Sequence, residues 1–432
     1  MEFVPAIVAC ALVAFAVVSR RLGTSWITGT MVFTAIGLVL GPEVLDLVDP
    51  EGPIASFEVL SVLLTGTLVI VLFTDASAIS SSSWRDDVIA ARLLGIGLPL
   101  AIVFGWLVAL VLLGDLELWE AAVLGTMLAP TDAALGKAVV SNPRVPVRIR
   151  QTLNIESGLN DGIALPIFIV FLETARATEA SLPVADIITE LVQQVGIAAV
   201  VGLAVGWIGA HMITWGRTSG TAIGYWLQIG LVVLAILAYT LATPLGGSGF
   251  IAAWVAGYFF GRFHDASDDE SLPEYAEATG DLLTVASFLV FGVFLGPVLA
   301  DLTWEIVAYG VLSLTVVRMV AVAFSLLRSG MRSRSVLYIG WFGPRGLATI
   351  ILTLEVVDES HLIGGPTIAD AALFTVALSV LAHGLTAWWG SNTYADYIAT
   401  HPDAANLAEH DPTILDVRVP LRSRHHARTV DG

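Results

Sequence analysis

Apolar runs recur along almost the whole chain, and each is long enough to cross a lipid bilayer. The runs last roughly 17 to 25 residues, close to the length that a spanning helix needs. Hydrophobic residues make up 56% of the 432 residues and charged residues only 13%, unlike the usage of soluble domains. A transmembrane β-barrel would show short alternating segments instead. The sequence therefore predicts an all-α polytopic membrane protein.

We expect about thirteen transmembrane helices in this chain. Arginines support the count, because loops that face the cytoplasm carry most of the basic residues. The arginines of the loops follow the odd-numbered helices. The loops on the other side of the membrane, after the even-numbered helices, hold a single arginine, Arg176. This pattern predicts a cell-membrane protein with its N-terminus outside and its C-terminus in the cytoplasm. The predicted helices lie near residues 3–19, 24–40, 57–79, 88–113, 119–140, 151–173, 184–214, 221–241, 247–263, 279–300, 303–327, 335–357 and 367–389.

The chain divides into a transmembrane domain, residues 1–390, and a tail of mixed polarity, residues 391–432, which we expect in the cytoplasm. The net charge of −18 comes mostly from loops and the tail, including the acidic loop 264–270, and indicates a solvated acidic surface. Cys10 is the only cysteine, so the chain has no intrachain disulfide and no spaced metal-ligand pattern. We expect no cofactor and no nucleic-acid partner.

Four charged residues fall near the middle of predicted spans: Asp132, Asp161, Arg318 and Arg345. At about 1.5 Å per residue, each lies roughly 15 to 23 Å from the start of its helix. Charges at this depth are costly unless they are paired or line a water-filled cavity. Isolated ion pairs between helices are one reading, but clustering at a single depth favours a shared polar site.

Two of these helices also contain a proline within two residues of the charge, Pro130 in the fifth and Pro344 in the twelfth. Proline removes a backbone donor, so both helices should be broken there. Without the seventh helix, the other twelve form two sets of six, in which the fifth and twelfth correspond and run in opposite directions. Such an inverted repeat with matching broken, crossing helices indicates a secondary transporter with a midplane binding site. Asp132 and Arg345 would offset the exposed dipole ends.

The sixth helix adds further polar side chains at a four-residue spacing, which keeps them on one face. Ser157 lies on the face of Asp161, and these two with Thr131 and Asp132 would form a cage of oxygen atoms. Such a cage suits a hard cation such as Na⁺. Thr131, Asp132, Ser157 and Asp161 are therefore the predicted cation and proton ligands.

The neighbouring face of the same helix carries Glu156 and Asn160. Glu156 is placed to pair with an arginine, and Arg318 is our candidate partner. Asn160 would be a neutral positioning group beside Asp161.

Three motifs resemble those of the monovalent cation:proton antiporter superfamily. They are Ala129–Asp132, Glu156–Gly162 and Gly343–Gly346, in the same order and inside the expected helices. The Asn-Asp pair is similar to that of the electroneutral sodium/proton exchanger branch, with its NhaP-type and NHE-type members. The resemblance implies a homodimer in which a core domain of six helices moves against a dimerisation domain.

Carried over by position, the resemblance makes Asp161 the ion-binding aspartate and Thr131 with Asp132 the pair in the unwound helix. It gives Ser157 as a further ligand. The third helix of the family usually has an acidic residue after a phenylalanine, and Asp75 fits that position, although a solvated helix-end acid is an equal reading.

The resemblance also matches Glu156 and Arg318 to the family's stabilising ion pair. The segment Ile79–Ser83 departs from the more charged stretch common in the family, so a regulatory role of that loop is not carried over.

The function implied is exchange of Na⁺, or Li⁺, for H⁺ by competition at Asp161, with a role in pH homeostasis. With Asn160 in place of a second acid, one positive charge crosses each way. A K⁺/H⁺ or broad cation exchanger of the same fold is the main alternative, and an ion channel is a weaker one. A membrane-embedded hydrolase would need a zinc motif or a serine nucleophile elbow, and the sequence has neither, so we expect no enzyme.

Overall fold

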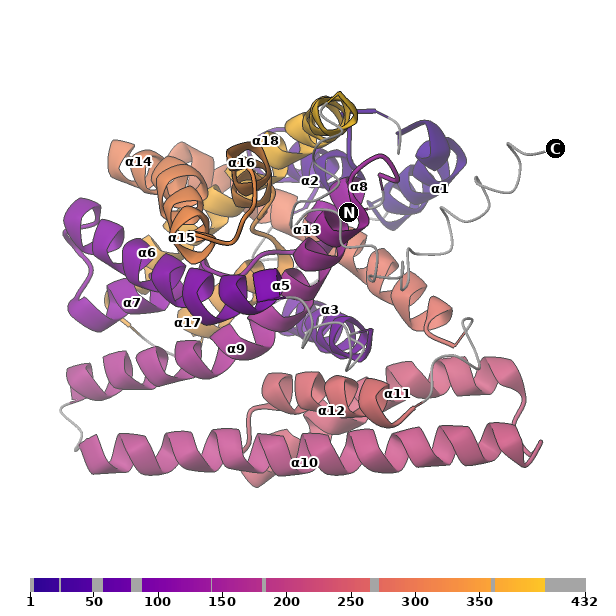
Figure 1. Cartoon of the computed structure of the whole chain (residues 1–432). Helices are drawn as coiled ribbons and strands as arrows, with labels where there is room; N and C mark the ends of the chain where they lie inside the picture. Colours follow the sequence, from indigo (N-terminus) through magenta and orange to yellow (C-terminus); the bar gives the residue numbers. More distant parts are fainter. Residues whose placement is uncertain are drawn as a thin grey trace.

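The computed structural model describes residues 4–22, 25–48, 57–78, 88–140, 142–180, 184–264, 272–358 and 362–400, and all regular structure in these ranges is helical (Figure 1). The all-α prediction is confirmed. Ile79–Ser83, most of the acidic loop and the tail after residue 400 lie outside the described residues.

Some of the helices join end to end. We call each such run, or each single long helix, a rod, and the rods follow the predicted order. Two rods in the first half are irregular. The rod of α5, η1 and α6 is continuous but contains a π-helical turn, whereas α7 and α8 are separated by an unwound segment. The elements are α1 (Val4–Leu22), α2 (Gly29–Leu40), α3 (Phe57–Ser77), α5 (Val88–Arg92), η1 (Leu93–Gly97), α6 (Leu98–Leu112), α7 (Leu118–Met127), α8 (Ala133–Val140) and α9 (Val147–Ala180).

The second half repeats this order after the long helix α10. Again one rod contains a π-helical turn, η4, and the next is broken between α16 and α17. The elements are α10 (Val184–Thr218), α11 (Gly224–Ala242), η2 (Thr243–Leu245), α12 (Gly249–Phe263), α13 (Glu274–Ala300), α14 (Trp304–Leu312), η4 (Ser313–Val317), α15 (Arg318–Ser325), α16 (Ser333–Trp341), α17 (Leu347–Asp358) and α18 (Gly365–Ala399).

The π-helical turns were not predicted, yet they strengthen the repeat. π-Helices are rare and usually occur as single turns inside α-helices. Here they lie in the fourth and eleventh rods, directly before the two broken rods. When α10 is set aside, these positions correspond. The two sets of six helices therefore match in two kinds of irregularity, and not only in their breaks.

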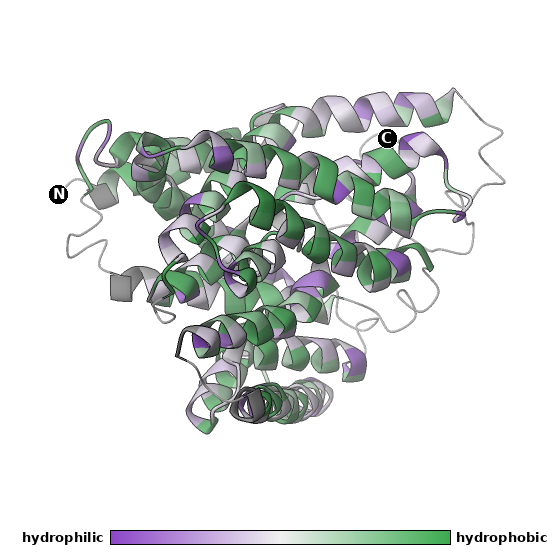
Figure 2. Cartoon of the chain, turned by 90° about the vertical axis from the view of Figure 1, so that its left-hand side faces the viewer, coloured by the Kyte–Doolittle hydropathy of each residue, from purple (hydrophilic) through white to green (hydrophobic). Residues whose placement is uncertain are grey.

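Seven of the described helices are long and apolar enough to span a membrane. They include α9, α10, α13 and α18, and Figure 2 shows hydrophobic residues on most of the helices. The two broken rods are not among the seven because each half is too short. The chain is a multi-pass membrane protein.

The final helix differs most from its predicted bounds. The apolar run ends near residue 389, but α18 continues to Ala399. Its last turns are amphipathic, with Tyr394 and Ile398 buried in a cluster that also contains Leu153 and Tyr338. A hydropathy window misses such a helix, because its polar face lowers the average. Tertiary packing extends the helix beyond the apolar run.

The helices form two groups around α3 and α13. In Figure 1, α10, α11 and α12 lie together on one side, and α12 packs on α3. Helix α13 packs along α2 and also contacts α3, α17 and α18. The broken rods lie on the other side of α3. The rod of α7 and α8 contacts α9 and α18, and the rod of α16 and α17 contacts α18.

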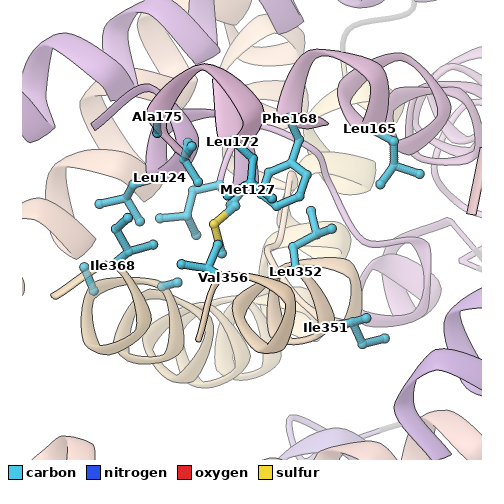
Figure 3. Packing of buried hydrophobic residues seen from close by; sticks show 14 of the residues in the cluster. Leu124, Met127, Leu165, Phe168, Leu172, Ala175, Ile351, Leu352, Val356 and Ile368 are labelled. Atoms are coloured by element: carbon cyan, nitrogen blue, oxygen red, sulfur yellow. The ribbon is translucent and has the colours of Figure 1, made fainter. Parts of the chain in front are cut away.

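A hydrophobic cluster fixes the broken rods in place (Figure 3). Met127 at the end of α7 packs among Phe168 and Leu172 of α9, Leu352 of α17 and Ile368 of α18. These side chains are at most 4% exposed. The cluster holds one half of each broken rod against α9, whose earlier turns carry Ser157 and Asp161.

Candidate functional site

The unwound segments of the two broken rods cross and bond to each other directly. The backbone N–H of Asp132 donates to the carbonyl of Pro344 at 2.8 Å. In return, Nη1 of Arg345 donates to the carbonyl of Pro130 at 2.8 Å. The breaks predicted at the two prolines are thus present. Each segment bonds to a backbone group of the other segment that has no helical partner at its break.

Asp132 caps the two half-helices that begin at this crossing. Its Oδ1 accepts from the backbone N–H of Leu135 in α8 at 3.2 Å, and its Oδ2 accepts from that of Leu347 in α17 at 2.6 Å. A carboxylate at helix N-termini is favoured by the dipole and by the unpaired N–H groups. Gly346 is required beside it, because a Cβ there would lie 2.0 Å from Oδ2.

Arg345 is the opposite charge at the same crossing and is completely buried. Its guanidinium reaches the carbonyl end left open after α7, where a cation offsets the partial negative charge. Its own backbone N–H donates to the hydroxyl of Ser379 on α18 at 2.7 Å. The expectation that these two charges lie at exposed helix ends agrees with this geometry.

Three predicted residues form a hydrogen-bonded group between the first break and α9. The hydroxyls of Thr131 and Ser157 lie 3.1 Å apart. Nδ2 of Asn160 donates to Oγ1 of Thr131 at 2.7 Å and to its carbonyl at 3.2 Å. Asn160 is 1% exposed. It therefore anchors the unwound segment to α9, one residue before Asp161.

Asp161 lines a small cavity with Asp132, Thr131 and Asp75. The volume of the cavity, measured as the space available to the centre of a water-sized sphere, is about 20 Å³. This is room for about one water molecule. Within the described ranges the Asp161 carboxylate makes no hydrogen bond, unlike that of Asp132. Ser157 is not part of the cavity wall and is joined to it only through Thr131.

Glu156 and Arg318 form the buried ion pair expected from the sequence. Nη1 and Nη2 of Arg318 donate to the two carboxylate oxygens at 2.5 and 2.9 Å. Nη2 also lies 3.4 Å from the carbonyl of Ile339. The pair connects α9 to α15 and α16 behind the crossing.

Several supporting residues were not predicted. Buried Glu120 accepts hydrogen bonds from the backbone N–H groups of Glu117 and Gly364, at 2.8 and 2.6 Å, and so joins α7 to the start of α18. Thr349 donates to the carbonyl of Met127 at 2.8 Å. The contacts of Glu120 with Gly364 and of Thr349 with Met127 join residues that are distant in sequence, so no local motif predicts these contacts. Glu120 alone had a local signal, a capping box at the start of α7.

The fold and the site together define a polytopic helical membrane protein with a polar centre at two crossed, interrupted helices. The model of the family described as "Sodium/hydrogen exchanger, transmembrane" matches residues 7–389. The chain belongs to this family, as the resemblance of its three motifs predicted.

Two curated relatives carry potassium in their names. The K(+)/H(+) antiporter NhaP2 of Shewanella sp. (strain ANA-3) is 26% identical over 88% of this chain and 64% of its own length. The K(+)/H(+) antiporter NhaP of Alkalimonas amylolytica is 28% identical over 80% of this chain and 59% of its own length. This chain thus spans about three fifths of the length of these relatives.

A solved structure has the same fold. The sodium proton antiporter MjNhaP1 from Methanocaldococcus jannaschii at pH 8 superposes with a TM-score of 0.68 at 21% sequence identity. The match covers 93% of this chain and 98% of that one.

Proposed function

We propose that this chain is a secondary antiporter that exchanges a monovalent cation for H⁺ at Asp161, and not an enzyme. One observation carries the proposal. Asp161 is the carboxylate of the cavity that has no hydrogen bond in the described ranges, whereas Asp132 beside it is bonded at both oxygens. Asp161 can accept either a proton or a cation without breaking the crossing.

The proposed ligands are Asp161, Thr131 and Asp132, with Ser157 acting through the Thr131 hydroxyl. Each Asp132 oxygen keeps a lone pair beyond its bond to a backbone N–H. Oxygen ligands of this kind suit Na⁺, Li⁺ or K⁺. Asp75 on α3 adds negative charge at the cavity wall.

Transport follows from competition for this one carboxylate. When the cavity opens to one side, the cation leaves and a proton takes its place, and the reverse occurs on the other side. The Asn160 amide adds no second exchangeable charge, so one positive charge moves in each direction and exchange is electroneutral. We place the protein in the cell membrane as a homodimer, N-terminus outside, with a role in pH homeostasis.

Sodium is the cation we place first, because the Asn160–Asp161 pair resembles the sodium branch. Potassium is the second candidate, favoured by the names of the relatives above.

The test is proton flux in everted vesicles with Na⁺, Li⁺ or K⁺ over a pH series. Competition predicts that the cation concentration for half-maximal flux rises as the pH falls. Asp161→Asn should abolish flux while the protein remains folded in the membrane, with Asp281→Asn on α13 as a matched control that keeps it. Cation-dependent flux in Asp161→Asn would refute the site.

Electroneutrality has its own readout. Purified protein in liposomes with a pH gradient and Na⁺ should generate no membrane potential, and a clamped potential should not change the rate. A potential that appears only with the cation would overturn this part of the proposal.

A further inference from the structure

The cavity around Asp161 has two walls that come from different groups of helices. One wall consists of the crossing, namely Pro130–Asp132 and Gly346–Thr349, together with Asp161 of α9. The other comes from α3 and α13, and its polar members are Asp75 and Thr284. Thr284 is the single residue of α13 in the cavity wall among the described residues.

Several buried threonines in the helices satisfy their hydroxyls in a way that Thr284 does not. Thr67, Thr126 and Thr375 each donate to the carbonyl four residues earlier, the usual way to satisfy a hydroxyl in an apolar helix. Thr284 is only 5% exposed. Within the described ranges its hydroxyl has no hydrogen-bond partner, either on its own helix or elsewhere.

A hydroxyl that lines a cavity and has no protein partner is free to bond to whatever the cavity holds. Its surroundings indicate what that is. The same cavity is lined by Asp75, Asp132 and Asp161, so it attracts cations. A hydroxyl oxygen is a neutral ligand for hard monovalent cations and can complete a coordination shell without changing its charge.

We infer that Thr284 is a cation ligand supplied by α13, so that the transported ion is held between both walls. This inference rests on the proposed function. A neutral ligand on the far wall changes affinity and the discrimination between cations of different radius. It leaves the exchanged charge at Asp161 unaltered.

The experiment compares Thr284→Val with Thr284→Ser and with Thr34→Val. Valine has nearly the shape of threonine without the hydroxyl, and serine keeps the hydroxyl. Thr34 on α2 is the matched control, because its Oγ1 has no hydrogen-bond partner either but is enclosed away from the cavity. Each variant is assayed in everted vesicles at fixed pH with Na⁺, Li⁺ and K⁺.

Thr284→Val should raise the cation concentration for half-maximal flux by about tenfold, equivalent to about 1.4 kcal/mol, and should alter the ratio between the three cations. Thr284→Ser should stay within about twofold of the unmodified protein. Thr34→Val should match the unmodified protein. Values for Thr284→Val that equal those of the unmodified protein, or a rise shared by Thr34→Val, would overturn the inference.

The two levels of the proposal fail in different ways. Absence of cation-dependent flux from the unmodified protein refutes the proposed antiport itself. Flux in the unmodified protein that Asp161→Asn abolishes and Thr284→Val leaves unchanged refutes only the role of Thr284.

Discussion

The crossing of the broken rods and the contact between α10 and α12 are both close approaches of helices, but opposite means hold them together. At the crossing, Asp132 and Arg345 bond to backbone groups freed by the breaks. Between α10 and α12, Gly206 instead brings the helix against the carbonyl of Ala256, which would lie 2.4 Å from an added Cβ. Unbroken helices in lipid need only small residues to pack closely, whereas broken ones need charges at fixed positions.

The largest effect is expected beside the crossing, at the buried Glu156–Arg318 pair. Glu156→Gln leaves the guanidinium buried without its counter-charge, which should cost about 3–5 kcal/mol of stability. Thermal unfolding in detergent would measure the loss. The double variant Glu156→Gln with Arg318→Met should recover much of it, since both charges are then absent. A single variant as stable as the parent would show that water reaches Arg318.

The next effect concerns Asp132 itself. Asp132→Ala removes two charge-assisted bonds to helix N-termini and should lower stability by about 3 kcal/mol. Asp132→Asn keeps an acceptor oxygen and should lose less, by the same thermal assay. Equal losses in the two variants would mean that the negative charge, and not the hydrogen bonding, holds the half-helices.

Alanine substitutions at Gly346 and Gly206 compare the crossing directly with the contact between α10 and α12. Gly346→Ala and Gly206→Ala both force a methyl group into occupied space, at about 1–3 kcal/mol each. Only Gly346→Ala should also abolish cation-dependent flux, because it displaces the Asp132 carboxylate. Flux per folded molecule, after quantification by gel filtration, separates the two. Loss of flux in Gly206→Ala would mean that the α10–α12 contact takes part in transport.

The smallest effect belongs to an exposed ion pair, Arg144 with Asp396 on the last turns of α18. The side chains are 53% and 66% exposed, and such pairs contribute about 0–1 kcal/mol. Arg144→Ala should shift the unfolding temperature only slightly, and added salt should remove even that shift. A loss as large as that of Glu156→Gln would contradict the distinction between buried and exposed charges.

The sequence was sufficient for the elements whose signal is local. Apolar runs predicted the rods, and Pro130 and Pro344 predicted the breaks, because lipid leaves few alternatives to a continuous helix. The ion pair of Glu156 and Arg318 could be chosen because few buried arginines were available.

What the sequence could not give depends on partners far apart in the chain. The place of Asp132 at the helix ends was expected, but its bond to Leu347 was missed because that residue is 215 positions away. The open hydroxyl of Thr284 was missed too, because an unbonded threonine in an apolar helix looks the same in sequence as a bonded one. The end of α18 was placed too early for a third reason, its amphipathic packing.

The mutual bonding of the two breaks has a consequence for how the protein is made. During synthesis the first break is made well before the second, so the backbone N–H of Asp132 and the carbonyl of Pro130 lack these partners until Pro344 and Arg345 follow. Contacts of such long sequence separation form late. A chain that stops after α15 would therefore contain most of its helices and still lack the groups that bond to Pro130 and Asp132 at the crossing.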